Sequence, residues 1–395
     1  MGINKDSQKA PNLRFKGFTD DWEQRELGEL AEVSSSKRIH LRDYVTKGVP
    51  FYRGSEISNG GNPKESELFI SENLYYEIKE KYGIPEPGDL LITAVGTLGN
   101  IWKVDNREFY YKDGNLIRLS QLKVNSNFIL AFFSDGYGKR KLLDSAAGSN
   151  QKALTITKMK KITFFLSSKE EQLKIGDFLK LLDDTIALHQ RKLDQLKKLK
   201  EALLQQMFPG KGETVPKLRF AGFEGDWEEL KLSAVVDKQI KGKAQADKLN
   251  PGTVEYLDTA RLNGGEPFLT DGISNVMEND ILILWDGSKA GTVYIGFEGT
   301  LGSTLKAYRT SSDSQFVFQY LKRYQEHIYN NYRTPNIPHV QKDFLEVFTI
   351  KVPTMKEQTK IGNTLKYLDE TIILQERKLD QLKNMKQVLL ENMFI

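Results

Sequence analysis

The stretch Arg191-Lys-Leu-Asp-Gln-Leu-Lys197 returns letter for letter at Arg377 to Lys383, 186 residues further along the chain. The identity extends to both sides of this core. Residues 171–208 and 357–394 match at 24 of 38 positions without a gap. Shared composition does not produce such identity, so the two blocks are duplicates, and an internal repeat organises the whole sequence.

A second pair of copies stands at the start of each half. Pro11-Asn-Leu-Arg-Phe-Lys-Gly-Phe18, closed by Asp21-Trp22-Glu23, returns 205 residues later as Pro216-Lys-Leu-Arg-Phe-Ala-Gly-Phe223 with Asp226-Trp227-Glu228. The two offsets differ by 19 residues, so the segments between the copied ends differ in length. The repeated unit is therefore a constant opening, a divergent middle and a constant end.

One similarity survives in the divergent middles. Gly88-Asp-Leu-Leu-Ile-Thr93 resembles Asn279-Asp-Ile-Leu-Ile-Leu284, and each is followed by a glycine-rich stretch, 96–99 or 287–291. A short apolar run that ends in such a stretch predicts a buried strand and a tight loop.

The constant end predicts a long helix with one apolar seam. Apolar residues recur at steps of four and three for about five heptads, which is typical of coiled-coil pairing. Both copies place polar residues at the same two seam positions, 189/375 and 200/386, and polar seam residues restrict register. A helix of about 38 residues spans roughly 57 Å. The seam residues are Ile175, Leu179, Leu182, Ile186, His189, Leu193, Leu196, Lys200, Leu203 and Met207, with copies at Ile361, Leu365, Leu368, Ile372, Gln375, Leu379, Leu382, Lys386, Leu389 and Met393.

Two pairings of these helices are possible. They could join two separate chains, or they could pair within one chain. The duplication favours an internal antiparallel pair, because Pro209-Gly210 breaks the first helix and lets the chain restart. The predicted fold class is α+β, with two globular α/β domains joined by two long antiparallel coiled-coil helices as a pseudo-twofold repeat. The predicted bounds are 11–165 and 216–352 for the globular domains, 166–208 and 353–395 for the helices, and 209–215 for the linker.

Composition excludes several classes of protein. The chain is 39% hydrophobic and 28% charged, as in globular proteins. It has no cysteine, so it has no disulfide, thiolate metal site or cysteine nucleophile. The polar start lacks the apolar core of a signal peptide, and no apolar run is long enough for a membrane helix. We therefore expect a cytoplasmic protein. The net charge of +4 permits nucleic-acid binding without arguing for it.

Catalytic motifs are missing. Gly287-Ser-Lys-Ala-Gly-Thr292 lacks the lysine that a phosphate-binding loop needs after its second glycine. No Asn/Asp-Pro-Pro-Tyr sequence, which amino-methyltransferases use to hold a flipped base, is present. The four histidines lack ligand spacing, so we expect no metal site. Asp89 and Asp280 precede apolar strands and could serve a nuclease, but they lack a Glu-x-Lys partner, and a structural role is the simpler interpretation.

Taken together, the repeated openings, the Glu-Gln that begins each long helix and the Lys/Leu/Asp helices resemble the specificity subunits of Type I restriction-modification enzymes. The resemblance covers nearly the whole chain. It implies a non-catalytic subunit whose two target-recognition domains each bind one half of an interrupted double-stranded DNA site. It also implies two modification (methyltransferase) subunits docked on the helices and two restriction (translocase/nuclease) subunits. This chain would bind no cofactor itself, with S-adenosylmethionine, ATP and Mg²⁺ on the partner subunits.

The divergent middles add a prediction about the target. Two different readers indicate two different half-sites and hence a non-palindromic sequence. Two readers held tens of ångströms apart suit half-sites about one helical turn, 34–36 Å, apart.

DNA contacts need cationic or amide side chains on loops that reach a groove or a phosphate. Such residues are more often solvated surface, so that role stays open for each. The candidates are Lys37, Arg38, Arg53, Ser55, Thr97, Asn100, Asn150, Gln151 and Lys152 in the first half, and Lys241, Lys243, Arg261, Ser288, Lys289, Thr304, Lys306, Arg333 and Asn336 in the second. Arg14, Arg219, Trp22 and Trp227 are expected instead to fix the start of each domain.

Two other functions remain open. The chain could be a scaffold whose globular heads bind proteins, which predicts no DNA retention together with a modification subunit. It could also be a nuclease with an unrecognised motif, which predicts DNA cleavage by the purified chain with a divalent metal.

Overall fold

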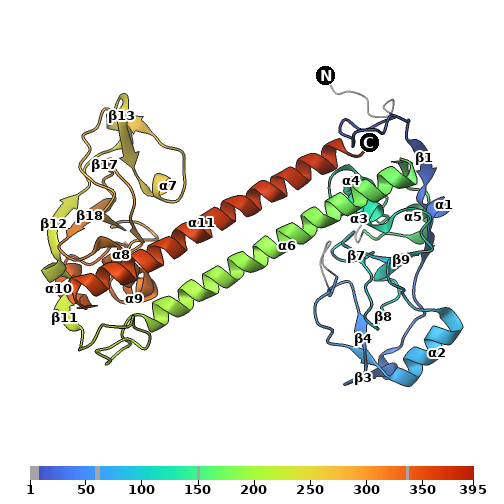
Figure 1. Ribbon diagram of the computed structural model, residues 1–395, viewed down its shortest axis with the longest axis horizontal. Helices are drawn as coiled ribbons and strands as arrows, with labels where there is room; N and C mark the ends of the chain where they lie inside the picture. Colours follow the sequence, from blue (N-terminus) through green and yellow to red (C-terminus); the bar gives the residue numbers. More distant parts are fainter. Residues whose placement is uncertain (1–8, 58–62, 149–151, 335–337) are drawn as a thin grey trace. The chain divides into compact units, whose positions relative to one another are not determined.

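The computed structural model describes residues 9–57, 63–148, 152–334 and 338–395 (Figure 1). The chain forms two compact units. The first unit contains Met1–Gln190 and Arg377–Ile395, and the second contains Arg191–Glu376. Each unit therefore combines one globular domain with parts of both long helices, and each is described by itself.

The first unit has three sheets. A two-stranded sheet pairs β1 with β10, a four-stranded sheet has the order β2-β9-β6-β7, and another has the order β3-β5-β4-β8. The elements are β1 (Glu23–Glu26), α1 (Leu27–Leu30), β2 (Glu32–Ser34), the 3₁₀ turn η2 (Leu41–Asp43), β3 (Tyr44–Val45), β4 (Val49–Tyr52), β5 (Phe69–Ile70), α2 (Glu72–Tyr82), β6 (Leu90–Thr93), β7 (Ile101–Lys103), β8 (Tyr110–Tyr111), β9 (Leu116–Ser120), α3 (Ser126–Ser134), α4 (Gly136–Asp144), α5 (Ile156–Lys160), β10 (Thr163–Leu166) and the start of α6 (Lys169–Gln206).

The second unit repeats part of this plan. It pairs β11 with β19, and its sheets have the orders β12-β18-β15-β16 and β14-β13-β17. The elements are β11 (Glu228–Lys231), η3 (Leu232–Val235), β12 (Val236–Lys241), η4 (Ala246–Lys248), β13 (Pro251–Leu257), α7 (Thr259–Leu262), β14 (Leu269–Thr270), β15 (Ile281–Leu284), β16 (Val293–Tyr294), β17 (Thr300–Leu301), β18 (Leu305–Thr310), α8 (Ser314–Arg323), α9 (Gln325–Asn331), α10 (Phe344–Val347), β19 (Thr349–Val352) and the start of α11 (Met355–Asn392).

The middle segments share a four-stranded antiparallel sheet although their sequences hardly align. Strands β2, β9, β6 and β7 have the same order and directions as β12, β18, β15 and β16. The predicted apolar strands are its buried members, since Leu90–Thr93 and Ile281–Leu284 are buried at every position. The two units differ in the smaller sheets beside this one.

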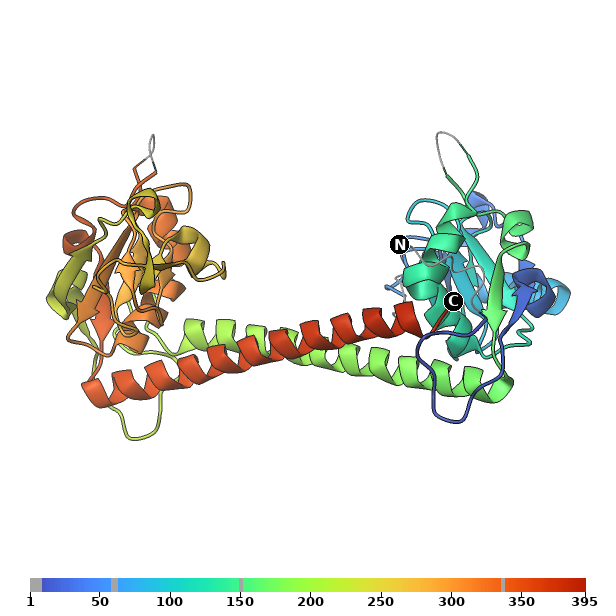
Figure 2. The same ribbon diagram turned by 90° about the horizontal axis from the view of Figure 1, so that it is seen from above.

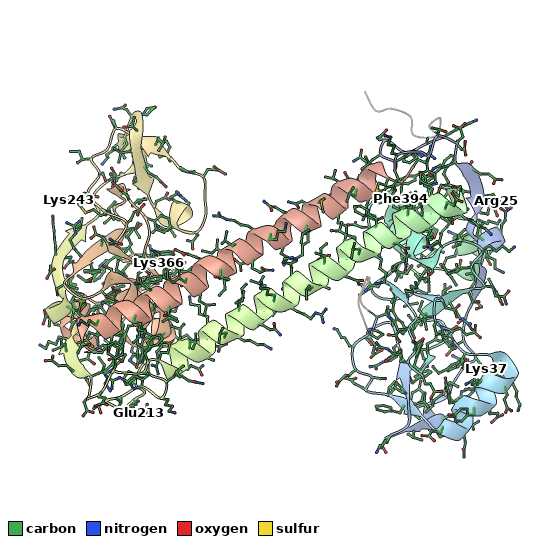
Figure 3. All side chains as sticks on the ribbon, viewed as in Figure 1. Arg25, Lys37, Glu213, Lys243, Lys366 and Phe394 are labelled. Atoms are coloured by element: carbon green, nitrogen blue, oxygen red, sulfur yellow. The ribbon has the colours of Figure 1, made fainter. Side chains whose placement is uncertain are left out.

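The end of each long helix belongs to the core of one unit. In the first unit Phe394, which follows α11 and is labelled in Figure 3, packs with its ring centroid 5.1 Å from that of Phe128 and 6.5 Å from that of Trp22. In the second unit Phe208, just after α6, packs 5.4 Å from Phe316 and 6.2 Å from Trp227. Each half of the sequence therefore supplies part of the other half's core, and the pairing is within one chain.

The parts of α6 and α11 that belong to one unit lie side by side (Figures 1 and 2). In the second unit Lys197 contacts Glu376 at 2.6 Å and Lys200 contacts Asp369, so the helices are antiparallel. In the first unit Lys386 lies 2.5 Å from Asp183. Lys200 and Lys386 are the second polar seam residue of each copy, and each binds an aspartate of the other helix. The predicted fold class is confirmed.

Within the described ranges, no helix has the length and apolar character needed to cross a bilayer.

Candidate nucleic-acid interface

The constant openings are fastened to the constant helices. The Arg14 guanidinium donates two hydrogen bonds, of 2.8 and 2.7 Å, to the buried carboxylate of Glu171, and the Trp22 indole donates another of 3.1 Å. Arg219 repeats the two bonds to Glu357 at 2.8 Å each. A buried carboxylate is costly unless it is paired. In each half, this ion pair fastens the copied opening to the copied Glu-Gln. Arg14 and Arg219 therefore fix the start of each domain, as the sequence predicts.

The glutamine that follows each glutamate positions a second element. The Gln172 amide oxygen accepts from the backbone N of Asn125, which caps α3, and its nitrogen donates to the Ser167 carbonyl. Gln358 makes the matching bonds with Asp313, which caps α8, and with Pro353. The constant residues therefore build a frame around each divergent segment.

Asp89 and Asp280 also belong to the frame. Asp89 accepts from Arg118 at 2.7 Å and from the backbone N of Glu86 at 2.8 Å. Asp280 accepts from both arms of Arg309 at 2.9 Å and from the backbone N of Met277. Burial raises the pKa of Asp280, but these hydrogen bonds outweigh burial and the pKa lies below its ordinary value. The structural interpretation of these aspartates is confirmed.

The strand directions bring many second-half candidates to one edge of the four-stranded sheet, meaning the side on which the strand ends lie and not an outer strand. The C-terminal ends of β12 and β15 meet the N-terminal end of β18 there, because Lys241 pairs with Lys306 and Leu284 with Leu305. The glycine-rich loop after β15 leaves the sheet at this edge. The candidates gathered there are Lys241, Lys243, Ser288, Lys289, Thr304 and Lys306.

The second-half candidates differ in how they are held. Lys241, Lys243, Ser288, Lys289 and Thr304 are exposed, and Figure 3 shows Lys243 at the surface of its unit. Lys306 is half-buried.

Two arginines of this half are bound within the unit. The Arg333 guanidinium donates to the carbonyls of Ser288 and Tyr329, at 2.9 and 2.8 Å, so it braces the loop. Arg261 is bound to Glu255 beside α7. Asn336 lies outside the described residues.

The first-half candidates follow the equivalent edge, where β2 and β6 end and β9 begins. Lys37 and Thr97 are exposed there. Arg38 is exposed and lies 3.4 Å from Asp113. The Asn100 amide donates to the Ile57 carbonyl at 3.1 Å, which ties the glycine-rich loop to the segment after β4. Lys152 is exposed, and Asn150 and Gln151 lie outside the described residues.

Arg53 and Ser55 converge on one buried acid. The Arg53 guanidinium lies 2.7 Å from Glu56 and 3.1 Å from Glu67, and the Ser55 hydroxyl donates to Glu56 at 2.9 Å. Hydrogen bonding to Glu56 raises the pKa of Arg53. Arg53 therefore needs to exchange a carboxylate for a base or a phosphate before it can bind DNA.

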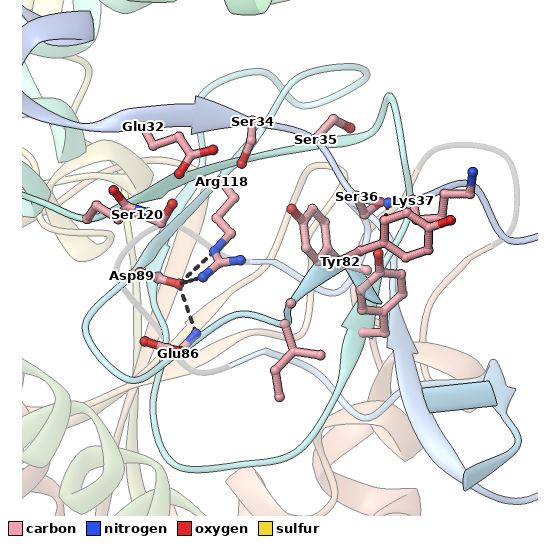
Figure 4. Close-up of a pocket in the computed structure, with 15 residues that line it drawn as sticks. Glu32, Ser34, Ser35, Ser36, Lys37, Tyr82, Glu86, Asp89, Arg118 and Ser120 are labelled. Atoms are coloured by element: carbon pink, nitrogen blue, oxygen red, sulfur yellow. Dashed lines mark hydrogen bonds and ion pairs between the residues drawn. The ribbon is translucent and has the colours of Figure 1, made fainter. Parts of the chain in front are cut away.

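A polar pocket of about 620 Å³ opens beside Lys37 (Figure 4). Hydroxyl groups of Ser34, Ser35, Ser36 and Tyr82 line it, together with the Arg118–Asp89 ion pair at its base. The Lys37 ammonium lies 5.1 Å from the Tyr82 ring centroid. The side chains of this pocket offer both donors and acceptors to a polar ligand group.

Sequence reasoning missed Tyr82, Trp285 and Glu56 in these surroundings. Trp285 holds the Lys306 ammonium over its ring, 3.1 Å from the centroid. The Arg53-x-x-Glu56 spacing was a usable signal, whereas the contact of Lys306 with Trp285 depends on strand pairing. Across the described part of the chain, no group of three or more His, Cys, Asp or Glu side chains could hold a metal ion.

Comparison with known proteins agrees with this architecture. Residues 19–198 and 224–384 match the family described as "Type I restriction modification DNA specificity domain". The chain is 32% identical over 179 residues to the type I restriction enzyme MjaVIII specificity subunit of Methanocaldococcus jannaschii, which covers 43% of this chain and 42% of that relative. With the MjaX chain of the same archaeon, named as a putative specificity subunit, it is 23% identical over 93% of this chain and 91% of the relative.

A solved structure has the same fold. The crystal structure of the Type I restriction-modification system S subunit from M. genitalium superposes with a TM-score of 0.70 over 98% of this chain and 99% of that one, at 17% identity. Two matched segments that together cover most of the sequence, each lying mainly in one unit, carry the assignment beyond a shared fold. The chain belongs to the Type I restriction-modification DNA specificity family.

Proposed function

We propose that each unit reads one part of an asymmetric, interrupted double-stranded DNA site. The observation that carries this proposal is the pair of equivalent sheet edges, at which candidate side chains gather in the segments after β2 and β6 and on or beside β12, β15 and β18. The frames of the two edges match, but the side chains on them differ. Different donors on matching frames favour different half-sites.

The helix pair would set the gap between the half-sites and dock the modification subunits. Two features support this role. Each long helix is anchored at its far end by a phenylalanine in a core, Phe208 or Phe394. Several large apolar residues of the helices, among them Leu181, Leu188 and Leu374, stay exposed beside the seam. Exposed apolar residues on a paired helix suit contact with a further protein.

The chain itself would act without catalysis. S-adenosylmethionine, ATP and Mg²⁺ would bind to two modification and two restriction subunits. This chain would recognise the DNA sequence on which those subunits act. The paired state of Asp89 and Asp280 supports this, because both carboxylates are held by arginines of the neighbouring strand.

Exchange of one globular domain tests the proposal. We expect that replacing residues 216–352 with the segment of another family member, in complex with modification subunits, changes one half of the methylated sequence. The matched control exchanges residues 11–165 and should change the other half. Changes in both halves after a single exchange would contradict the modular function, and a complex that retains no DNA would favour a protein-binding scaffold.

A further inference from the structure

The second unit carries two lysines in direct opposition on neighbouring strands. Lys241 on β12 is the register partner of Lys306 on β18, so both side chains leave the sheet on the same face. Like charges directly opposite each other destabilise a sheet. Neither lysine forms an ion pair with any carboxylate in the described part of the chain, whereas Lys231 and Lys351 of the same unit do.

Lys306 cannot easily move away from its neighbour. Its ammonium lies over the Trp285 ring, and Trp285 is itself only 9% exposed. Burial lowers the pKa of Lys306, and the charge of Lys241 lowers it further, while Asp286 opposes them weakly. The ring restrains the cation without neutralising it. The pair is thus a positive site in which Lys306 is restrained, and Asp286, which forms no ion pair with either lysine in the described residues, offsets the charge only weakly.

We propose that the Lys241–Lys306 pair binds a phosphate of the DNA backbone. A phosphodiester carries one negative charge and places its oxygens at the surface of the duplex, where lysine acts as a point charge. Lys243 and the Lys289 loop lie at the same edge, so a strand that bridges the pair would continue past further cations. This inference rests on the proposed function and names an anchoring site within it.

The first unit lacks this arrangement. Asp89–Ile92 corresponds to Asp280–Ile283, and Ile92 pairs with Ile117 where Ile283 pairs with Lys306, so an apolar residue takes the place of Lys306 in the first unit. The Lys37 ammonium lies beside Tyr82 instead of a second lysine. The second unit would therefore contribute more of the sequence-independent, salt-sensitive binding than the first.

The test measures DNA affinity against salt concentration for the full chain in complex with its modification subunits. The variants are Lys241→Gln, Lys306→Gln and the double variant, with Lys231→Gln as the control. Lys231 is exposed and pairs with Glu346 on the frame of the same unit. Loss of one phosphate contact lowers the slope of log affinity against log salt by about 0.9. We expect a decrease of about that size in the double variant, on cognate and unrelated DNA alike.

Two further measurements separate the loss of a phosphate contact from misfolding of the variants. Without DNA, Lys241→Gln should raise the melting temperature because it removes the repulsion, so weaker binding cannot be attributed to misfolding. Lys306→Arg, which keeps the charge, should keep the salt slope. A double variant with the wild-type slope would overturn the site while leaving the proposed function intact.

A third result would reassign the ligand. If inorganic phosphate stabilises the wild type more than chloride of equal ionic strength, and the salt slope does not depend on the pair, the ligand is free phosphate and the DNA assignment is overturned. A wild-type complex that binds no DNA would instead contradict the proposed function itself.

Discussion

Arg14 and Glu171 lie 157 residues apart in the sequence and form a two-bond ion pair, which Arg219 and Glu357 repeat in the second unit. The pair joins the constant opening of each half to the constant helix that ends it. Most of the chain between its members is the divergent middle. Duplication has therefore preserved a closed frame and left its contents free to differ.

Glu171→Ala should destabilise the first unit by about 2–4 kcal/mol, because the partly buried Arg14 loses its ion pair and the buried Trp22 indole loses its acceptor. Chemical denaturation followed by tryptophan fluorescence measures this change. Glu29→Ala is the control, since the Arg25–Glu29 pair is exposed and screened by solvent and should contribute little to stability. Equal losses of stability in the two variants would contradict a structural role for the Arg14–Glu171 pair.

Gly362→Ala should be destabilising although alanine is the better helix former. A Cβ at Gly362 would lie 2.6 Å from the Asp313 carboxylate and 2.8 Å from the Phe316 backbone N, the two groups that cap α8. We expect a loss of about 1–3 kcal/mol from cap disruption and overpacking. The neighbouring exposed variant Asn363→Ala should be neutral or slightly stabilising. Thermal unfolding compares them, and a stabilised Gly362→Ala would contradict the close packing.

The Lys386–Asp183 contact should fix the helix register. Reversing one charge, as Lys386→Glu or Asp183→Lys, should cost about 1 kcal/mol, because the pair is only partly buried. Combining the two changes should restore most of the stability, and a double-mutant cycle measures the coupling. Additive losses would mean that the contact has no part in register.

The Asp280–Arg309 pair should make the second unit sensitive to acid. The folded-state pKa of Asp280 lies below its ordinary value of 3.8, so the carboxylate stabilises the fold above about pH 4. That contribution is lost as the pH falls through the lowered pKa. The stability deficit of Asp280→Asn should therefore be largest near neutral pH and shrink in acid. Asp237→Asn, an exposed change on β12, should follow the wild type; a deficit independent of pH would exclude this ionic origin.

Lengthening both helices should widen the gap in the target. One heptad inserted after Gln190 and another after Glu376, which are equivalent positions, would add roughly 10 Å to each helix. We expect a longer gap, by up to about three base pairs, between unchanged half-sites. Seven residues inserted within 209–215 are the control, because Phe208 is already anchored before that loop. If methylation mapping finds an unchanged gap when both helices carry the extra heptad, the helix pair does not set the gap between the half-sites.

The frame was predictable from the sequence because it was written twice. The seam, its polar positions and the structural roles of Arg14 and Arg219 all follow from matching copies. The partners of Lys200 and Lys386 were not predictable, because the aspartates that they contact depend on how two distant helices align.

The candidate site was predictable only as a set of loops. Residue type nominated Arg53 and Arg261, yet both guanidinium groups are bound by glutamates of their own unit. The same reasoning named Lys241 and Lys306 separately but could not place them opposite each other, since strand register is a long-range property. Their roles in DNA binding stay predictions.

Methylome sequencing of cells that carry this chain with its modification partner tests the central claim most directly. Two different readers on one duplicated frame predict methylated adenines in a single motif of two unlike parts separated by a fixed gap. A palindromic motif, or no motif that depends on this chain, would contradict that account.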